Sequence, residues 1–379
     1  MELSFYDDIK VLQHEKLLYE IESNGGSASP PVHVRIELTE ACNFQCKFCW
    51  WHDPTRKIDH LLPNELDVTG KRQFNLPRLL ALIDEFAEMG VQAISFTGSG
   101  DPLLFPHVEH VLERIVAQGI QFGVTSNLAM KLKPSALYSL THASWIRWSM
   151  NAGSKDVYLA VNSPRAGGEA SAYERVVQNV STLLDSRREL KAPLQINASM
   201  VITEVNRRDV RAAAELAANL GVNSISFRPD VPPEADENSY KRFPDDLQAS
   251  IDQAHCDLSN DKFRVYADTE WLKDLRKPDD PDLLCFYSNH STFVAATGEV
   301  YPCCYTHGRR EFSMGNILDM SFQDFWNSSQ RRDNYRNLQF SHCPSCPYGK
   351  TNRILRELYD GSKSAEDLFV ISDTPAVFI

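Results

Sequence analysis

The sequence predicts an α/β protein in which a repeating strand–helix unit is followed by a small cysteine-rich module. Between residues 32 and 230, six short apolar strands alternate with amphipathic helices. Units of this kind fold with right-handed crossovers into a parallel sheet, which either closes into a partial barrel or stays open and doubly wound. The nine cysteines are the second observation, because they fall near the two ends of the chain and none lies between Cys49 and Cys256.

Residues 1–31 are expected to form an N-terminal helix and a linker. Apolar side chains recur at helical spacing between residues 8 and 22. The run Asn24-Gly25-Gly26-Ser27, followed by Pro30-Pro31, ends that helix. Alternation of apolar and polar residues then predicts the first strand at 32–38.

Local signals at the helix ends define the later helices. The helix over 76–89 has Asn75 as its expected N-cap and Gly90 just after its last residue. The helix over 171–190 opens with Ser171 and Glu174 at the spacing of a capping box. The other expected strands are 93–97, 121–125, 145–150, 194–202 and 224–227, and the other helices are 106–118, 134–140 and 207–220.

Three regions follow the repeat, whose core we expect to span 32–230. Residues 231–283 are acidic and interrupted by proline, which is typical of a solvated connector with one or two helices. Residues 284–349 are rich in Cys, Gly and aromatic residues, so we expect a small module held together by metal because it has little core of its own. Residues 350–379 are expected to form a helix and an apolar tail.

The composition excludes several classes of protein. A hydrophobic content of 42% and a charged content of 24% indicate a folded globular chain. The formal net charge of −12 argues against general nucleic-acid binding, which needs an excess of Lys and Arg. No apolar run is long enough to span a membrane, and the N-terminus lacks the order of a signal peptide. An odd number of cysteines without an export signal indicates a reducing, cytoplasmic setting.

The first cysteine cluster directly follows the first expected strand. Cys42, Cys46 and Cys49 have the spacing Cys-x3-Cys-x2-Cys, and His52 is the only nearby candidate for a fourth ligand. A structural zinc site needs four protein ligands. A cluster of four irons held by three thiolates keeps one iron open, which makes it a site for chemistry.

With the aromatic residue Phe48 before the third cysteine, this motif resembles that of the radical S-adenosylmethionine (SAM) superfamily. The resemblance covers roughly residues 32–230 and implies a partial (β/α)6 barrel. It also implies a [4Fe-4S] cluster on Cys42, Cys46 and Cys49, with SAM chelated to the open iron through its amino and carboxylate groups. Reductive cleavage of SAM then gives a 5′-deoxyadenosyl radical, which abstracts hydrogen from a substrate C–H bond.

Segments at the ends of later strands resemble the cofactor-binding motifs of that superfamily. Residues 96–104 resemble its Gly-Gly-Glu-Pro segment, although Ser99 replaces the first Gly and Asp101 replaces Glu. Residues 125–127 resemble Thr-Asn-Gly, and 147–153 resemble Arg-x-Ser-x-Asp-Ala-Gly. The residues that the resemblance implies for cofactor binding are Phe48, Gly100, Asp101, Asn127, Ser149 and Ile202. Taken singly, the last three fit a turn or core role equally well.

The second cysteine cluster has a different pattern. Cys285 and Cys303 flank an expected hairpin over 293–296 and 299–301, which would bring them together, and Cys343 and Cys346 form a Cys-x2-Cys turn. Four thiolates complete either a zinc site or a closed iron–sulfur cluster, and spacing alone does not choose between them. The pattern resembles the auxiliary-cluster module SPASM in its shorter form, called twitch, since no cysteine follows Cys346. The resemblance implies an auxiliary [4Fe-4S] cluster.

Two cysteines remain outside these sets. Cys256 and Cys304 are each expected to be buried as small apolar residues. The alternative for Cys304, which neighbours an expected ligand, is a catalytic thiol that returns hydrogen to a substrate radical. The adjacent Trp50 and Trp51 either line the substrate site or shield the first cluster from water.

The resemblance implies a radical enzyme and leaves its substrate open. We expect dehydrogenation or epimerisation of a sugar, aminocyclitol or other small metabolite, in natural-product or glycan biosynthesis. The start of the first strand near residue 32 favours this reading over one with a fused peptide-recognition domain. Modification of a peptide or protein side chain is the alternative, and a non-enzymatic iron–sulfur electron carrier is the competing class. The expected protein partner is a flavodoxin- or ferredoxin-type electron donor.

Overall fold

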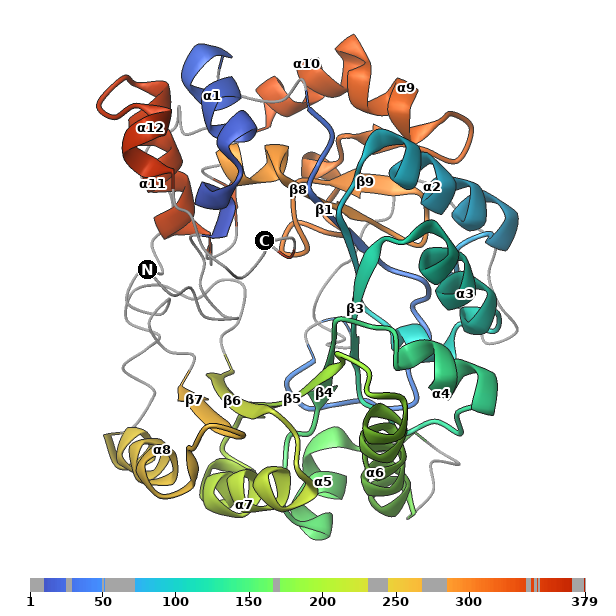
Figure 1. Ribbon diagram of the computed structural model, residues 1–379, viewed down its shortest axis with the longest axis vertical. Coiled ribbons are helices and arrows are strands. Elements are labelled where there is room, and N and C mark those ends of the chain that lie inside the picture. Colours follow the sequence, from blue (N-terminus) through green and yellow to red (C-terminus); the bar gives the residue numbers. More distant parts are fainter. Residues whose placement is uncertain are drawn as a thin grey trace.

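The computed structural model shows one mixed sheet of ten strands in the order β10-β9-β8-β1-β2-β3-β4-β5-β6-β7. The structure describes residues 10–24, 29–49, 51, 72–165, 171–230, 245–267, 285–338, 342–343, 346, 348–369 and 378. The strands follow an arc, and the helices between them lie on its outer side (Figure 1). The expected α/β architecture, a partial barrel followed by a small C-terminal module, is confirmed.

The central strands are the six that the sequence predicts, and all of them are parallel. They are β1 (His33–Ile36), β2 (Ala93–Phe96), β3 (Gln121–Ser126), β4 (Trp145–Ser149), β5 (Gln195–Ile202) and β6 (Ser224–Pro229). The connector adds a strand that was not predicted, β7 (Arg264–Ala267), parallel to β6. On the other edge, β8 (Ser291–Val294) pairs parallel with β1, and β9 (Glu299–Tyr301) and β10 (Gly315–Asn316) follow antiparallel.

Most helices lie where the sequence predicts them. The described helices are α1 (Glu15–Asn24), α2 (Leu76–Met89), α3 (Val108–Gln118), α4 (Pro134–Leu140), α5 (Lys155–Asn162), α6 (Ala172–Leu190), α7 (Val210–Leu220), α8 (Asp245–Leu258), α9 (Phe322–Asn327), α10 (Ser329–Asn337), α11 (Gly349–Tyr359) and α12 (Ala365–Leu368). Asn75 caps α2 by accepting from the backbone of Arg78 at 3.2 Å, and Gly90 ends it with φ 84°. Both signals are local, which is why the sequence alone locates this helix.

One helical expectation is wrong, and one helix was not expected. Ser171 precedes α6 without making a side-chain cap hydrogen bond, so the capping box does not form. Glu174 pairs instead with Lys155 of α5, at 2.6 Å. Helix α5 itself was not predicted. The pairing of Glu174 with a side chain on another helix is a tertiary contact that competes with the local cap.

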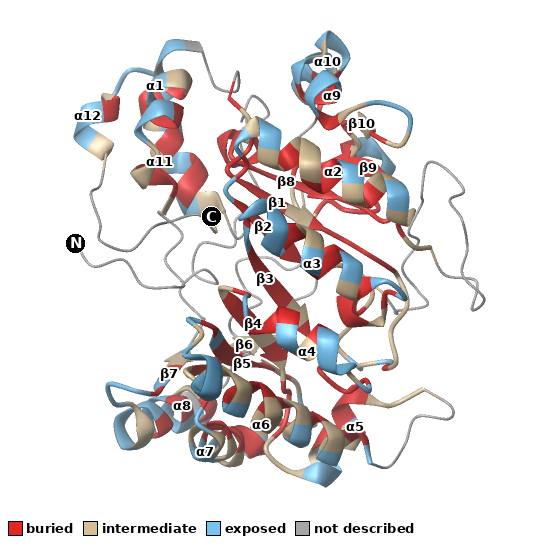
Figure 2. Ribbon diagram, turned by 45° about the vertical axis from the view of Figure 1, so that its right-hand side comes forward, coloured by how far each residue is buried: buried red, intermediate tan, exposed pale blue. Residues whose placement is uncertain are grey.

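The two faces of the sheet have opposite character. Val34 and Ile36 of β1 point outward into a core that they share with α2 and α3. Arg35 lies between these two residues in the strand and therefore points to the inner face. It is in register with Ser95 of β2. Figure 2 shows the buried residues along the strands and on the helix sides that face them. The inside of the arc therefore carries polar and charged side chains such as Ser95 and Arg35.

Aromatic rings fill the end of the inner face at which the strands begin. A Cβ on Gly123 would lie 2.1 Å from the indole of Trp145, so only glycine lets this ring lie across the neighbouring strand. Phe378, near the C-terminus, contacts both His33 and Trp145 edge-on, with ring centroids 5.4 Å apart in each pair. The opposite end, where the strands finish, carries the cysteine loop.

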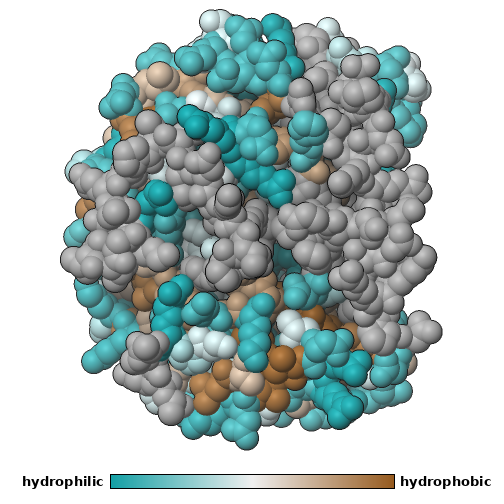
Figure 3. Space-filling model, turned by 180° about the vertical axis from the view of Figure 1, so that it is seen from behind, coloured by the Kyte–Doolittle hydropathy of each residue, from teal (hydrophilic) through white to brown (hydrophobic). Residues whose placement is uncertain are grey.

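The cysteine-rich module is built onto the main sheet. Because β8 pairs with β1, residues of the module such as Phe293, Val300 and Trp326 belong to the same buried cluster as the barrel core. Seen from behind, the described surface is mainly hydrophilic, with hydrophobic residues gathered toward its lower edge (Figure 3). Among the described helices, none combines the length and the apolar character that crossing a membrane would require.

Candidate active site

The first cysteine loop, whose first cysteine lies six residues after the end of β1, packs against the end of α5. The backbone N–H of Gln45 donates to Ser163 at 2.9 Å, and that of Lys47 donates to Val161 at 3.1 Å. The thiol of Cys46 donates to Asn162 Oδ1 at 3.4 Å. The unpredicted helix α5 thus positions the loop, and the structure brings Cys42, Cys46 and Cys49 together, with Phe48 on the same loop.

The chemistry of these thiols fits a metal cluster. Burial, reinforced by the nearby Asp101, raises the pKa of Cys42 to about 12. Burial also raises the pKa of Cys46, to which Cys42 and Cys49 contribute. Thiolates in such a setting need positive charge to be stable, and iron supplies it. Three sulfur donors leave one iron of a four-iron cluster open for a small-molecule ligand.

The segment after β2 packs directly on the cysteine loop. The backbone N–H of Asp101 donates to Ala41 at 2.9 Å. A Cβ on Gly100 would lie 2.3 Å from the carbonyl oxygen of Thr39 and 2.5 Å from that of Ala41. Gly100 is therefore required for the close approach of two backbone segments, whichever ligand lies beside them.

The Asp101 carboxylate links the segment after β2 to the end of β3. Its carboxylate accepts from the backbone of Leu103 at 3.1 Å, from Ser126 Oγ at 2.9 Å and from the backbone of Asn127 at 2.8 Å. Burial outweighs these hydrogen bonds and raises the pKa of Asp101 to about 6. Both carboxylate oxygens already accept protein donors, so the expected contact with the amino group of SAM stays a prediction.

The structure places the other expected cofactor residues in different surroundings. The side chain of Asn127 donates to Asn43 Oδ1 of the cysteine loop at 2.8 Å, so it lies beside the first cluster site. Ser149 ends β4 in register with Ser199 on the inner face. Ile202 is 6% exposed and belongs to the main hydrophobic core, so its expected place near an adenine ring also stays a prediction.

The second cysteine set comes together as the hairpin predicts. Strands β8 and β9 pair antiparallel, and Gly298 turns between them with φ 79°. The charges of Cys285 and Cys303 each act on Cys343 and Cys346, and burial raises the pKa of Cys303 to about 12. Four described thiols from three segments therefore surround one site.

The number of thiols at each site limits the metal that it can hold. Three thiols suit a four-iron cluster with one open iron, and four thiols suit either a zinc ion or a closed cluster. Among the described residues, no group of three or more His, Cys, Asp or Glu side chains that could hold a single metal ion is found.

The two leftover cysteines lie in different settings. Cys256 is exposed on α8, so the expectation that it is a buried small residue is wrong. Cys304 interacts electrostatically with Arg35, on the inner face of the barrel, and with Tyr348. That position lies between the auxiliary site and the barrel interior.

A buried contact between an acid and a histidine, which the sequence did not indicate, joins the two cysteine sites. The carboxylate of Glu37, just after β1, lies 3.2 Å from Nε2 of His307 in the cysteine-rich module. The ring of His307 also packs on Trp51, with centroids 4.2 Å apart, and on Phe293, at 4.4 Å. The signal available in the sequence was an acidic residue at an inward position of a strand, immediately before the cysteine loop.

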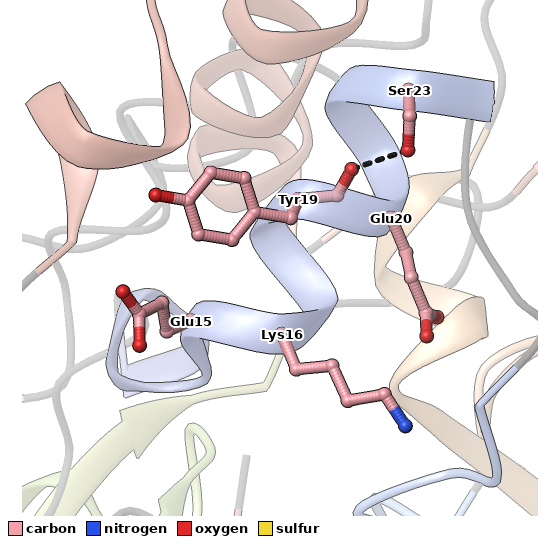
Figure 4. A pocket seen from close by; sticks show the side chains of 5 residues that line it. All are labelled: Glu15, Lys16, Tyr19, Glu20 and Ser23. Atoms are coloured by element: carbon pink, nitrogen blue, oxygen red, sulfur yellow. Dashed lines mark hydrogen bonds between the residues drawn. The ribbon is translucent and has the colours of Figure 1, made fainter.

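One hollow of about 460 Å³ lies on α1, lined by residues of that helix alone. Figure 4 shows its side chains, including Lys16 and Tyr19, spread along the helix surface. None of them is a cysteine or another expected site residue, so this hollow is separate from the two cysteine sites.

Comparisons with known proteins agree with this geometry. Residues 36–217 match the family model of the Radical SAM superfamily, and residues 285–347 match that of SPASM, an iron-sulfur cluster-binding domain. The second match contains all four cysteines of the auxiliary site. The two matches thus coincide with the two places at which the structure gathers thiols.

Individual relatives are distant. The antilisterial bacteriocin subtilosin biosynthesis protein AlbA of Bacillus subtilis (strain 168) is 21% identical over 344 residues, which cover 86% of this chain and 68% of AlbA. A probable GTP 3′,8-cyclase of Saccharolobus solfataricus is 27% identical over 203 residues, covering 52% of this chain and 56% of the cyclase. This chain therefore spans little more than half the length of that cyclase.

Among solved structures, Streptococcus suis SuiB bound to precursor peptide SuiA has a TM-score of 0.59 and 14% identity, with 100% of this chain and 83% of SuiB covered. SuiB bound to S-adenosylmethionine has a TM-score of 0.57, again with 14% identity, covering 95% of this chain and 80% of SuiB. At this level of identity the likeness concerns the fold.

Proposed function

Because the chain belongs to the radical SAM superfamily and carries a C-terminal SPASM domain, we propose that it modifies a peptide or protein side chain by radical hydrogen abstraction. The observation that carries the proposal is that the protein has two separate thiol sites, with three thiols at one and four at the other. A non-enzymatic electron carrier needs no three-thiolate site with an open iron beside it.

The cofactors follow from the family. The first site holds a [4Fe-4S] cluster and SAM, and the second holds an auxiliary iron–sulfur cluster. When bound, these groups supply a 5′-deoxyadenosyl radical and a one-electron acceptor. We propose that the auxiliary cluster is of the [4Fe-4S] type, because four thiols surround this site and four thiolates complete one closed cluster.

The protein residues hold and enclose these groups. Cys42, Cys46 and Cys49 supply the thiolates of the first site, while Asp101 and Asn127 brace the loop that carries them. Phe48, Gly100, Ser149 and Ile202 remain proposed cofactor-binding residues, as do Asp101 and Asn127.

The comparisons favour a peptide substrate over the small metabolite that the sequence favoured. The bacteriocin-biosynthesis protein AlbA aligns with most of this chain, and the fold of SuiB was solved with a precursor peptide bound. The preference for a sugar or aminocyclitol rested on the position of the first strand. A recognition element carried by another protein would remove that objection, so a peptide is the substrate class that we propose.

The outcome of the radical step belongs to the proposal as well. Oxidation of the peptide fits an auxiliary cluster that accepts an electron, whereas epimerisation needs a hydrogen donor. Cys304 is the proposed donor for the second outcome, because it lies between Arg35 and the auxiliary site. A Cys304→Ser variant with an unchanged product profile would remove epimerisation from consideration. A reduced flavodoxin- or ferredoxin-type protein is the proposed electron donor, and the cytoplasm is the proposed setting.

The experiment is deuterium transfer. The enzyme is reconstituted with iron and sulfide without oxygen, reduced, and mixed with SAM and precursor peptides encoded next to its gene, each deuterated at its Cα positions and side chains. We expect deuterium in 5′-deoxyadenosine with at least one peptide and none in a Cys42→Ala, Cys46→Ala, Cys49→Ala variant. Transfer from labelled aminocyclitols or sugars, with none from any peptide, would overturn the proposal.

A further inference from the structure

Arg35 projects from β1 into the barrel, toward the module that carries the auxiliary site. Its neighbours in sequence, Val34 and Ile36, point outward into the core, and Arg35 lies in register with Ser95 and Phe293 on the inner face. The guanidinium donates from Nη1 to Ser291 Oγ at 2.5 Å and from Nη2 to the hydroxyl of Tyr287 at 2.9 Å. The charge is thus fixed in space by two hydroxyl groups of the cysteine-rich module.

The guanidinium lies over a pair of stacked tyrosine rings. The rings of Tyr287 and Tyr348 are parallel within 11°, with centroids 3.7 Å apart. The Arg35 Cζ atom is 5.8 Å from each centroid. Tyr305 meets Tyr348 edge-on, with centroids 6.5 Å apart. These rings form one aromatic layer between the barrel wall and the auxiliary site.

A repeated sequence pattern attaches this layer to the auxiliary cysteines. A tyrosine follows three of the four expected ligands at the second position, in Cys285-Phe-Tyr287, Cys303-Cys-Tyr305 and Cys346-Pro-Tyr348. The backbone of Tyr287 also donates to Asn352 Oδ1 at 2.9 Å, and the Asn352 side chain reaches the sulfur of Cys285 at 3.8 Å. Arg35 is therefore connected to the ligand loops through a short chain of packed groups.

The buried surroundings of Arg35 allow its positive charge to act on the auxiliary cysteines. Tyr287 is 2% exposed, so little water lies between the guanidinium and the cysteines. In a medium of low dielectric a charge is screened weakly. Arg35 interacts electrostatically with Cys304, and Tyr348 does so with both Cys303 and Cys304. The hydrogen bonds to Ser291 and Tyr287 hold the guanidinium at this place.

A fixed positive charge near an iron–sulfur cluster favours the reduced form, which is more negative by one unit, so it raises the reduction potential. An arginine is always protonated in proteins, so the effect does not depend on pH. We propose that Arg35 is a positioning residue that raises the reduction potential of the auxiliary cluster and so makes it an acceptor for the electron that leaves the substrate radical. One electron passes from the carbon radical to the oxidised auxiliary cluster, the substrate releases a proton to water, and an electron carrier of the flavodoxin type reoxidises the cluster.

This inference rests on the proposed function only for the origin of the electron. Its test is the midpoint potential of the auxiliary cluster, measured by titration with spectroscopic detection in a Cys42→Ala, Cys46→Ala, Cys49→Ala background that retains the second site alone. We expect Arg35→Gln to lower the potential and Arg35→Lys to keep it near that of the background. Tyr287→Phe removes a hydroxyl that fixes the guanidinium but keeps the ring, so we expect a smaller shift in the same direction. Arg147→Gln, at an inward position three strands away on β4, is the control and should leave the potential unchanged.

An unchanged potential in Arg35→Gln would overturn the inference, and so would equal shifts in Arg35→Gln and Arg147→Gln. If the Arg35→Gln variant does not assemble the auxiliary cluster, the Tyr287→Phe variant is the test. An unchanged midpoint potential in that variant would also overturn the inference. The peptide proposal fails separately, through absent deuterium transfer, and that failure would not alter the potential of the auxiliary cluster.

Discussion

The carboxylate of Glu37 and the imidazole of His307 lie 3.2 Å apart, each only 1% exposed, and connect the barrel to the cysteine-rich module. The same carboxylate accepts from the backbone of Ser99 at 2.8 Å and from that of Ala296 at 3.1 Å. Three segments distant in sequence thus converge on one acid. Because β1 leads into the first cysteine loop and β8 into the second, this acid fixes the two cluster sites relative to each other.

The first prediction concerns the stability that this pair supplies. Burial alone would raise the pKa of Glu37, but His307 and Ser99 together lower it to about 2. A depressed folded pKa means that the stabilisation is complete above the unfolded value of about 4.3 and is lost as the pH falls toward 2. At pH 7 we expect Glu37→Gln to lower the free energy of unfolding by about 3 kcal/mol. Urea unfolding of the cluster-free protein, followed by tryptophan fluorescence, measures it.

A surface pair provides the control for that measurement. Glu215 pairs with Arg211 at 2.6 Å, and their side chains are 47% and 46% exposed. Exposed pairs of this kind are screened by water and contribute little. Glu215→Gln should therefore unfold like the unaltered protein. If both substitutions changed the free energy of unfolding equally, the buried pair would contribute no more stability than the exposed one.

The second prediction concerns iron content. The unaltered chain should bind about eight irons after reconstitution, since each site holds a cluster of four. The Cys42→Ala, Cys46→Ala, Cys49→Ala variant should keep about four and form no 5′-deoxyadenosine. The Cys343→Ala, Cys346→Ala variant should also keep about four, those of the first site. Iron and zinc are counted by elemental analysis, and one zinc per chain at the second site would contradict the assignment.

The third prediction tests Asp101 at the cofactor site. Its pKa of about 6 exceeds the unfolded value of about 3.9, so the folded protein holds the proton more tightly, and stability falls as the pH rises between these values. If the carboxylate contacts the amino group of SAM, affinity should rise as the pH passes 6. We expect Asp101→Asn to bind SAM about tenfold more weakly and without this pH dependence. Equilibrium dialysis on the reconstituted enzyme measures both.

Asp84 offers a matched carboxylate away from the site. It lies on α2 and pairs with Arg114 at 3.1 Å. Asp84→Asn should bind SAM like the unaltered enzyme at every pH. If Asp101→Asn retained both the affinity and its pH dependence, Asp101 would act only through its hydrogen bonds to neighbouring strand ends.

The elements that the sequence predicts well are those with local signals. Helix α2 has its cap, its first-turn proline and its terminal glycine within one stretch of chain. The two cysteine sets are likewise predictable, because ligand spacing is a local property. Strand β7 lies in an acidic connector and is a strand because it pairs with β6, so its state is decided by a distant partner.

The same reasoning explains what the sequence missed at the site. Glu37 and His307 are far apart in the chain, and neither belongs to a motif with fixed spacing. In the sequence, Arg35 is an ordinary charged residue in an alternating strand. Only the structure shows that Ser291 and Tyr287 lie beside it. The contacts of each of these residues depend on the pairing of β1 with β8, which joins the barrel to the cysteine-rich module.

The final prediction concerns Gly100, where two backbone segments meet. An added Cβ would lie 2.3 Å from Thr39 O and 2.5 Å from Ala41 O, and neither carbonyl can move without shifting the loop that carries Cys42. We therefore expect Gly100→Ala to lose iron from the first site and to form 5′-deoxyadenosine about 100-fold more slowly, while the auxiliary cluster remains. Gly119→Ala is the control, because Gly119 has φ 69° but nothing within 4 Å of its added Cβ. Its backbone strain should cost about 1 kcal/mol of stability and leave both clusters intact. Since the two substitutions add the same methyl group, a similar loss of iron in both would mean that close packing against the cysteine loop is not what requires glycine at position 100.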